Sequence, residues 1–174
     1  MIEVRLLRQE DDRSQFRSGQ PDLDRFFARY AGQNQFRHHI GNTYVAVEGG
    51  EILGFMTVSP AQIAIDHLPA AQRKRLPHYP LPVLRLARLA VAEPAQGRGI
   101  GRLLLRVALR LTREMSAALG GVGLVVDAKS EAVTFYRRYG FEPLDVLEGS
   151  LGDCPEPVSM FLPLSGIPDG PMHL

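Results

Sequence analysis

The pattern of apolar and polar positions begins as a strand and then becomes helical. Apolar residues alternate with mostly polar ones over residues 2–7, which predicts a half-buried first strand. From Asp22 to Tyr30 the apolar positions are spaced three and four apart, which predicts a helix with one buried face and Asp22 as its N-cap. The residues expected on the buried face are Leu23, Phe26, Phe27 and Tyr30.

Two β-rich runs follow and then a proline-rich segment. Residues 43–48 and 51–59 are separated by two adjacent glycines, which is a hairpin signal. Residues 60–82 are interrupted by prolines and predict a short helix and an exposed loop. Residues 83–91 are apolar on both faces, so we expect the central strand of a sheet there.

The second half of the chain alternates helices and strands. Residues 100–118 carry an apolar stripe opposed by arginines, which predicts an amphipathic helix that ends at Gly120. This order of elements predicts an α/β fold with a mixed sheet. The elements expected after the helix are a strand over 122–126, a helix over 132–139 and strands over 141–147 and 158–164.

Composition excludes several classes of protein. A chain of 174 residues is long enough for one domain, which we expect over residues 1–164 with a tail over 165–174. One Cys excludes a disulfide scaffold, and without an H-E-x-x-H motif or Cys/His cluster we expect no metal site. The apolar stretches are far shorter than the roughly 20 residues of a membrane span. We therefore expect a cytoplasmic protein without a membrane partner.

The charge balance alone does not indicate a nucleic-acid-binding protein. Twenty Lys+Arg against 19 Asp+Glu give a formal net charge of +1, so the chain lacks a global positive field. Only Lys74 and Lys129 are lysines, and arginine suits bidentate recognition of phosphate. A genome rich in GC gives the same arginine bias. The excess of arginine over lysine therefore indicates either phosphate recognition or genome composition, and both interpretations stay open.

The most informative segment is a glycine-rich loop between the expected central strand and the next helix. A helix N-terminus binds phosphate through its unpaired N–H groups, and glycine lets the backbone come close to the ligand. The dinucleotide fingerprint G-x-G-x-x-G fails because Arg102 or Leu104 occupies its last position, and no P-loop Gly-Lys-Ser/Thr occurs. The loop instead reads Gln96-x-x-Gly99-x-Gly101.

This loop resembles the pyrophosphate loop of the GNAT superfamily of acyl-coenzyme A N-acyltransferases, Q/R-x-x-G-x-G/A. The segment from Phe135 to Phe141 resembles the closing family motif F-Y-x-x-x-G-F. The resemblance implies the GNAT fold, with a mixed central sheet of six to seven strands flanked by about four helices. It also implies an acetyl-CoA-dependent N-acetyltransferase (EC 2.3.1 type).

Carried over by position, the resemblance assigns the acetyl-CoA site. Backbone groups of Leu89, Ala90 and Val91 would pair with the pantetheine arm and the thioester, and an amide near Leu89 would polarise the acetyl carbonyl. Loop N–H groups would bind the pyrophosphate, with side chains of Arg98 and Arg102 as further contacts, although Arg102 equally suits a solvated helix face. The loop residues are Gln96, Gly97, Arg98, Gly99, Ile100, Gly101 and Arg102.

Tyr136 stands where many GNAT enzymes place a general acid. Its usual pKa near 10 keeps it protonated at neutral pH, so that it can protonate the departing thiolate. The alternative is a core aromatic residue. No general base stands out, and an α-amine with a pKa near 8 does not need one. The residues considered as a base are Glu48, Glu51, His67 and His78.

Much of the chain is similar to one GNAT branch, the TacT-type toxins of type II toxin-antitoxin systems. This resemblance implies a homodimer that acetylates the α-amine of aminoacyl-tRNA and blocks translation, and a ribbon-helix-helix antitoxin whose C-terminal segment covers the active site. The similar segments are residues 16–27, 31–37, 42–47, 76–83 and 85–91.

Basic residues before and within the expected central strand favour an RNA acceptor, because arginines suit an RNA backbone. Two other interpretations stay open. One is a GNAT acetyltransferase for a small-molecule amine or a protein N-terminus, and the other is a binding protein that has lost catalysis. The candidate nucleic-acid contacts are Arg29, Arg37, Arg73, Lys74, Arg75 and Arg85.

Overall fold

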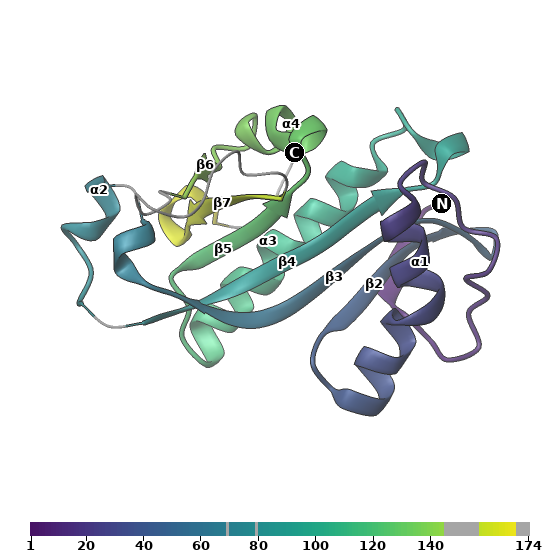
Figure 1. Cartoon of the computed structure of the whole chain (residues 1–174), viewed down its shortest axis with the longest axis horizontal. Helices are drawn as coiled ribbons and strands as arrows, with labels where there is room; N and C mark the ends of the chain where they lie inside the picture. The colour runs from purple at the N-terminus through teal and green to yellow at the C-terminus, as the bar shows by residue number, and fades with distance from the viewer. Residues whose placement is uncertain (69, 79, 145–156, 170–174) are drawn as a thin grey trace. The chain divides into compact units, whose positions relative to one another are not determined.

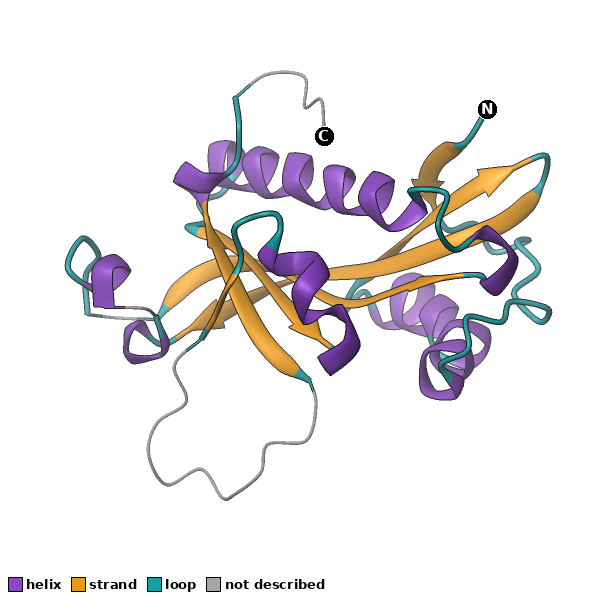
Figure 2. Ribbon diagram, turned by 90° about the horizontal axis from the view of Figure 1, so that it is seen from above, coloured by secondary structure: helices purple, strands orange, loops and turns teal. Residues whose placement is uncertain are grey.

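The structure is a computed structural model that describes residues 1–68, 70–78, 80–144 and 157–169. Its seven strands follow the order β1-β2-β3-β4-β5-β7-β6, so β4 is the middle strand, as its two apolar faces predict. α3 is the longest helix (Figure 2). The strands are β1 Glu3–Leu6, β2 Asn42–Glu48, β3 Glu51–Ile63, β4 Leu81–Val91, β5 Gly123–Ala128, β6 Glu142–Pro143 and β7 Val158–Pro163, and the α-helices are α1 Pro21–Arg29, α2 Ala70–Arg73, α3 Ile100–Ala118 and α4 Val133–Arg137.

The internal contacts divide the chain into two compact units. Unit 1 contains residues 1–59 and 86–108, and unit 2 contains the described residues of 60–85 and 109–169. The boundaries fall inside β3, β4 and α3, so these three elements continue from one unit into the other.

Unit 1 is built on an antiparallel meander of β1, β2 and the first part of β3. The β2–β3 hairpin turns at Gly49 and Gly50, both with positive φ, as the paired glycines predict. Helix α1 covers this meander (Figure 1), and the ring of Phe27 stacks on that of Phe55 with centroids 4.3 Å apart. The aromatic side chains of α1 therefore fix this helix on the sheet.

Helix α1 differs from its predicted form at both ends. It begins at Pro21 with Gln20 as N-cap, so the expectation that Asp22 is the N-cap is wrong. Proline already has the helical φ and lacks the N–H that would stay unpaired, which suits it to the first helical position. Tyr30, expected on the buried face, lies just past the helix end and is 47% exposed. A π-helical turn, η1 (Gln33–His38), follows α1.

Unit 2 contains the antiparallel strands β5, β7 and β6. Leu124, Val126 and Met160 are buried on β5 and β7, as the apolar run over 122–126 predicts. The strand expected over 141–147 appears as β6, and residues 145–147 lie outside the described part of the chain. In the proline-rich segment the short helix α2 forms as expected, and a 3₁₀ turn precedes it. The expectation of helix and loop is wrong at both ends of residues 60–82, because β3 continues through Pro60 to Ile63 and β4 already begins at Leu81. None of the helices in the described ranges combines the length and apolar character of a membrane span.

Candidate functional site

The glycine-rich loop of unit 1 connects β4 to α3 through a 3₁₀ turn over residues 93–95. Gly97 and Gly99 have φ values of +83° and +81°, which L side chains rarely adopt. A Cβ added at either glycine would meet no atom within 4 Å. The loop conformation thus requires glycine, and its outer side is open.

The backbone hydrogen bonds of the loop show which N–H groups can face a ligand. Gln96 and Arg98 donate their N–H groups to the carbonyls of Glu93 and Ala95, both at 3.3 Å. The first i to i−4 bond of α3 runs from the N–H of Leu103 to the carbonyl of Gly99 at 3.1 Å. The N–H groups of residues 100–102 precede this ladder, where the helix dipole adds partial positive charge. Gln96 and Arg98 therefore shape the loop through their N–H groups, and the first turn of α3 supplies donors for an anion.

Gly54 on β3 sets how closely the start of α3 approaches the sheet. A Cβ at Gly54 would lie 2.9 Å from Ile100 Cγ2 and 3.0 Å from the carbonyl oxygen of Ala90. Because glycine has no Cβ, Ile100 packs there and is only 1% exposed. Next to it, Ala90 is buried, while Leu89 and Val91 are half-buried. Gly54 was missed by the sequence reasoning, since a lone glycine in a strand carries no signal of what approaches it.

Arg98 and Glu48 form an ion pair at the surface of unit 1. Arg98 Nη2 donates to Glu48 Oε2 at 2.9 Å, and this hydrogen bond lowers the pKa of the Glu48 carboxyl. A carboxylate held in this way is a weaker base, so the ion pair makes Glu48 less suitable as a general base. Arg102 is exposed on the first turn of α3.

Tyr136 lies in unit 2, on α4, and is 3% exposed. Its ring makes edge contacts with Phe135 and Phe141, at centroid distances of 5.1 and 5.5 Å. Burial raises the pKa of the phenol above its usual value, and the negative charge of Asp127 raises it further. Tyr136 is thus a core aromatic and also stays protonated at neutral pH, which is the state a general acid requires.

Arg85 is engaged in an ion pair in unit 2. Its Nε and Nη2 both donate to Asp127 Oδ2, the Nε at 2.7 Å. The Asp127 side chain is 9% exposed and that of Arg85 48%. Arg85 thus neutralises a carboxylate near Tyr136 and keeps part of its surface in solvent. The sequence signal for this pair is a basic residue in one apolar strand and an acidic residue in another, but it does not show that the two face each other.

The other candidate RNA contacts divide between the units. Arg29 and Arg37 are exposed at the ends of α1 and η1 in unit 1. In unit 2, Lys74 and Arg75 are exposed after α2, while Arg73 is half-buried and donates to the carbonyl of Asp66 at 3.5 Å. The structure does not bring all six candidates together within one unit.

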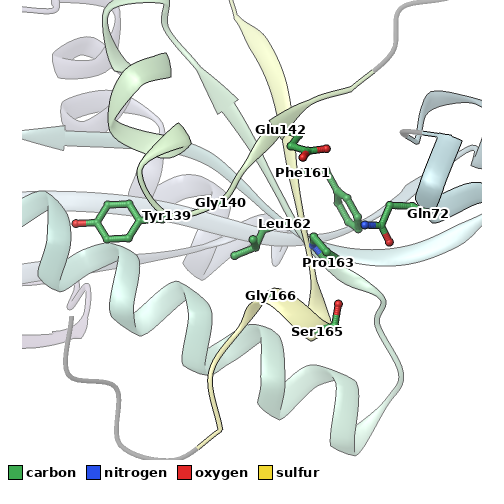
Figure 3. Close-up of a pocket in the computed structure, with 9 residues that line it drawn as sticks. All are labelled: Gln72, Tyr139, Gly140, Glu142, Phe161, Leu162, Pro163, Ser165 and Gly166. Carbon is green, nitrogen blue, oxygen red and sulfur yellow. The ribbon is translucent and has the colours of Figure 1, made fainter.

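Unit 2 contains a pocket beside β7. It is lined by residues of β7, by Tyr139 in the turn that follows α4, by Glu142 of β6 and by Gln72 of α2 (Figure 3). None of the predicted site residues lines this pocket. In the described ranges, no group of three or more His, Cys, Asp or Glu side chains is placed to hold a metal ion.

Comparison with known proteins gives a consistent family match. The family model for the acetyltransferase (GNAT) domain matches residues 39–143, more than half of the chain. A tRNA-acetylating toxin of Mycobacterium tuberculosis is 34% identical over 140 residues, which cover 79% of this chain and 83% of that toxin.

Solved structures of similar fold include two of one toxin. AtaT complexed with acetyl-methionyl-tRNAfMet has a TM-score of 0.82 at 26% identity, with 96% of this chain and 97% of that chain covered. A tyrosine-to-phenylalanine variant of AtaT, bound to the C-terminus of the antitoxin AtaR and to acetyl-CoA, has a TM-score of 0.76 at 25% identity, with 95% of each chain covered.

Proposed function

The chain belongs to the GNAT acetyltransferase family, and on this premise we propose that it is a toxin that acetylates the α-amine of aminoacyl-tRNA and so blocks translation. The observation that carries this proposal is the similarity to a tRNA-acetylating toxin over most of both chains. The transferase domain we assign to residues 1–164. Its donor is acetyl-CoA, the cosubstrate of the AtaT variant of similar fold.

We assign donor binding to β4 and to the loop that follows it. The N–H groups of residues 100–102 would bind the pyrophosphate, in the open space beside Gly97 and Gly99. Backbone groups of residues 89–91 would pair with the pantetheine arm and polarise the acetyl carbonyl. Arg98 and Arg102 would add side-chain contacts to phosphate, and Arg98 would leave Glu48 to do so.

The reaction transfers an acetyl group from sulfur to nitrogen. The neutral α-amine attacks the thioester carbon, a C–N bond forms, and the C–S bond breaks as the tetrahedral intermediate collapses. The nitrogen loses a proton to water, and the CoA sulfur takes one from the Tyr136 hydroxyl. The Tyr136 phenolate is then reprotonated from solvent, which restores the enzyme for the next turnover. An amine with a pKa near 8 is partly neutral at physiological pH, so the step needs no dedicated base.

The acceptor proposal is supported by an acid-free stretch of unit 1. From Arg25 to Val47 the chain holds three arginines and two histidines and no Asp or Glu. This stretch contains the exposed Arg29, Tyr30 and Arg37, a combination of basic and aromatic side chains that suits single-stranded RNA. We assign residues 73–75 and 85 as further contacts to the RNA backbone.

The proposed partners follow from the same function. A protein that acts on aminoacyl-tRNA works in the cytoplasm, where charged tRNA is found. We propose that the chain forms a homodimer and is inactivated by a ribbon-helix-helix antitoxin. Antitoxin binding is supported by AtaT, which is bound to the C-terminus of AtaR in a structure of similar fold.

The test incubates the protein with labelled acetyl-CoA and a complete set of charged tRNAs. We expect label on the amino acid of at least one isoacceptor, released with the amino acid on mild alkaline hydrolysis of the ester. Label on a free small amine or a peptide N-terminus, with all tRNAs unlabelled, would overturn the toxin function in favour of another GNAT activity.

Tyr136→Phe tests whether Tyr136 is the general acid that protonates the CoA sulfur. Removal of one hydroxyl should lower kcat by about 100-fold, the usual size of a general acid's contribution. Binding of acetyl-CoA, measured by calorimetry, should stay within about twofold because the aromatic packing is kept. Tyr139→Phe, in the turn that follows α4, is the matched control and should retain wild-type kcat. An unchanged kcat for Tyr136→Phe would remove Tyr136 from the mechanism.

A further inference from the structure

The backbone turn at Arg17 and Ser18 is joined to the segment that leads into the glycine-rich loop. The carbonyl of Arg17 accepts the N–H of Glu93 at 2.9 Å, and the carbonyl of Ser18 accepts Gln96 Nε2 at 3.0 Å. Both contacts lie within unit 1 and link residues more than 70 positions apart. The loop is therefore held from outside its own sequence.

Gln96 makes this link with its side chain. Its Nε2 also donates to the carbonyl of Val91 at 3.1 Å, so both hydrogens of the amide are used. One side chain thus connects the last residue of β4 to Ser18, directly before the two glycines with positive φ. The motif assigns the Gln96 backbone to the ligand, whereas its side chain binds the protein.

Ser18 is in turn fixed by Asp24 of helix α1. Asp24 Oδ1 accepts two hydrogen bonds from Ser18, one from its N–H at 3.0 Å and one from its side-chain hydroxyl at 2.6 Å. Ser18 is 7% exposed, and α1 is anchored on the sheet by its buried phenylalanines. Hydrogen bonds to a carboxylate are stronger than those between neutral groups. A continuous series of contacts therefore runs from the core through Asp24, Ser18 and Gln96 to the loop.

The loop depends on these contacts because its own glycines contribute little to holding its conformation. Nothing lies within 4 Å of a Cβ position at Gly97 or Gly99, so no side chain packs on that side. Glycine also has the largest conformational freedom of any residue. A loop that is already ordered before binding loses less entropy when the ligand arrives.

We infer that Asp24, Ser18 and Gln96 are positioning residues that hold the glycine-rich loop in its anion-binding shape before acetyl-CoA binds. This inference rests on the proposed function, since it takes the pyrophosphate of acetyl-CoA as the ligand of the loop. The three side chains act through the loop backbone and take no part in the bonds that form and break.

The test uses Gln96→Met and Asp24→Ala in the full chain. Each change leaves carbonyl or N–H groups near the loop unpaired, and CoA should bind about tenfold more weakly by calorimetry. The KM for acetyl-CoA should rise with kcat at saturation unchanged. With S-acetylpantetheine, a donor without pyrophosphate, kcat/KM should equal that of the wild type. The double variant should bind CoA at most about twofold more weakly than the weaker-binding single variant. The two effects should not add, because both changes break the same series of contacts.

Asp12→Ala is the matched control. Asp12 Oδ1 accepts the N–H and hydroxyl of Ser14 at 2.9 and 2.6 Å, the same arrangement as that of Asp24 with Ser18. Its removal should leave CoA affinity at the wild-type value. Where Asp24→Ala lowers the folded fraction seen by circular dichroism, Ser18→Ala replaces it, since that change removes only one hydroxyl.

Wild-type CoA affinity in folded Gln96→Met and Asp24→Ala would overturn the inference. An equal loss of activity with S-acetylpantetheine would do the same, because it would show general damage to the site. These outcomes differ from failure of the proposed function. A wild-type protein that does not bind CoA would refute both, and one that binds CoA but leaves every charged tRNA unmodified would refute the acceptor alone.

Discussion

Tyr136 combines a place in the core with the protonation state that a general acid requires. Its ring contacts two phenylalanines in the core, and its hydroxyl stays protonated because burial opposes the charged form. Asp127 adds to this effect, and Arg85 partly balances Asp127 through its ion pair. The environment thus keeps the phenol protonated in the free protein, although the same raised pKa makes it a weaker acid.

The raised pKa of Tyr136 predicts a difference in stability at alkaline pH. As pH rises above the ordinary tyrosine pKa of 10.0, the unfolded chain loses this proton while the folded protein keeps it. Stability from this group is complete below that pH and falls above it. The free energy of unfolding of the wild type should fall by up to about 1.4 kcal/mol per pH unit more than that of Tyr136→Phe.

Urea unfolding of the two proteins from about pH 8 to about pH 11 measures this difference. The other tyrosines are common to both proteins and cancel in the comparison. Parallel stability curves across this range would contradict the prediction.

At the residue scale, the sequence predicts candidate site residues but not their contacts. The two motifs select Tyr136 and the loop as candidates, because these residue types occur at fixed spacing. The ion pair of Arg85 with Asp127 and the hydrogen bonds of Ser18 with Asp24 and Gln96 were not predicted. Such contacts depend on which side chains the fold brings together, and spacing along the chain carries no record of that.

At the scale of elements, the glycine-rich loop joins a strand and a helix whose positions are fixed by packing. Gly54 lets Ile100 approach β3, and this sets the first turn of α3. The glycines of the loop give it a conformation that other residues strain to adopt. A methyl group added at the loop should therefore weaken the proposed binding of acetyl-CoA in addition to straining the backbone.

Gly97→Ala tests this distinction, with Gly50→Ala as control. Both glycines have a φ of +83° and open space around a Cβ, so each change should cost about 1 kcal/mol of unfolding free energy. Only Gly97→Ala places a methyl group in the space assigned to the pyrophosphate, and its Kd for CoA should rise on the order of tenfold. Calorimetry and urea unfolding give the two quantities. Equal CoA affinity for both variants would place the pyrophosphate elsewhere.

The elements themselves were largely predictable from periodicity. The hairpin, the central strand and α3 follow from patterns of two and 3.6 residues, which local sequence records well. The end of α1 was not predicted, because Tyr30 continues the apolar spacing although the helix stops at Arg29. On α3, Leu105 and Leu109 are buried beside the expected stripe, since the packing of the whole protein selects the buried face.

At the scale of the whole molecule, the net charge of +1 conceals an uneven distribution. The stretch from Arg25 to Val47 has no acidic residue, so acidic side chains elsewhere in the chain balance its arginines. For RNA, the local field around exposed arginines matters more than the total, because salt screens charges beyond roughly 8 Å at physiological ionic strength.

The double variant Arg29→Gln/Arg37→Gln tests whether these two exposed arginines bind RNA. Its KM for charged tRNA should rise several-fold, and the slope of log(kcat/KM) against log[salt] should become shallower by about one for each phosphate that the variant no longer binds. The KM for acetyl-CoA should not change. Arg110→Gln is the control, because Arg110 is exposed on α3 and pairs with Glu114. An unaltered salt slope in the double variant would exclude these arginines from RNA binding.

The division into two units has a consequence for how this protein can be cut or recombined. Within the described ranges, unit 1 takes its residues from two separate stretches of sequence, and the boundaries interrupt β3, β4 and α3. No single truncation therefore releases either unit as an uninterrupted fragment. A genetic crossover near the middle of the coding sequence would exchange parts of both units at once, so chimaeras between relatives should exchange residues 60–85 together with the segment from 109 onward.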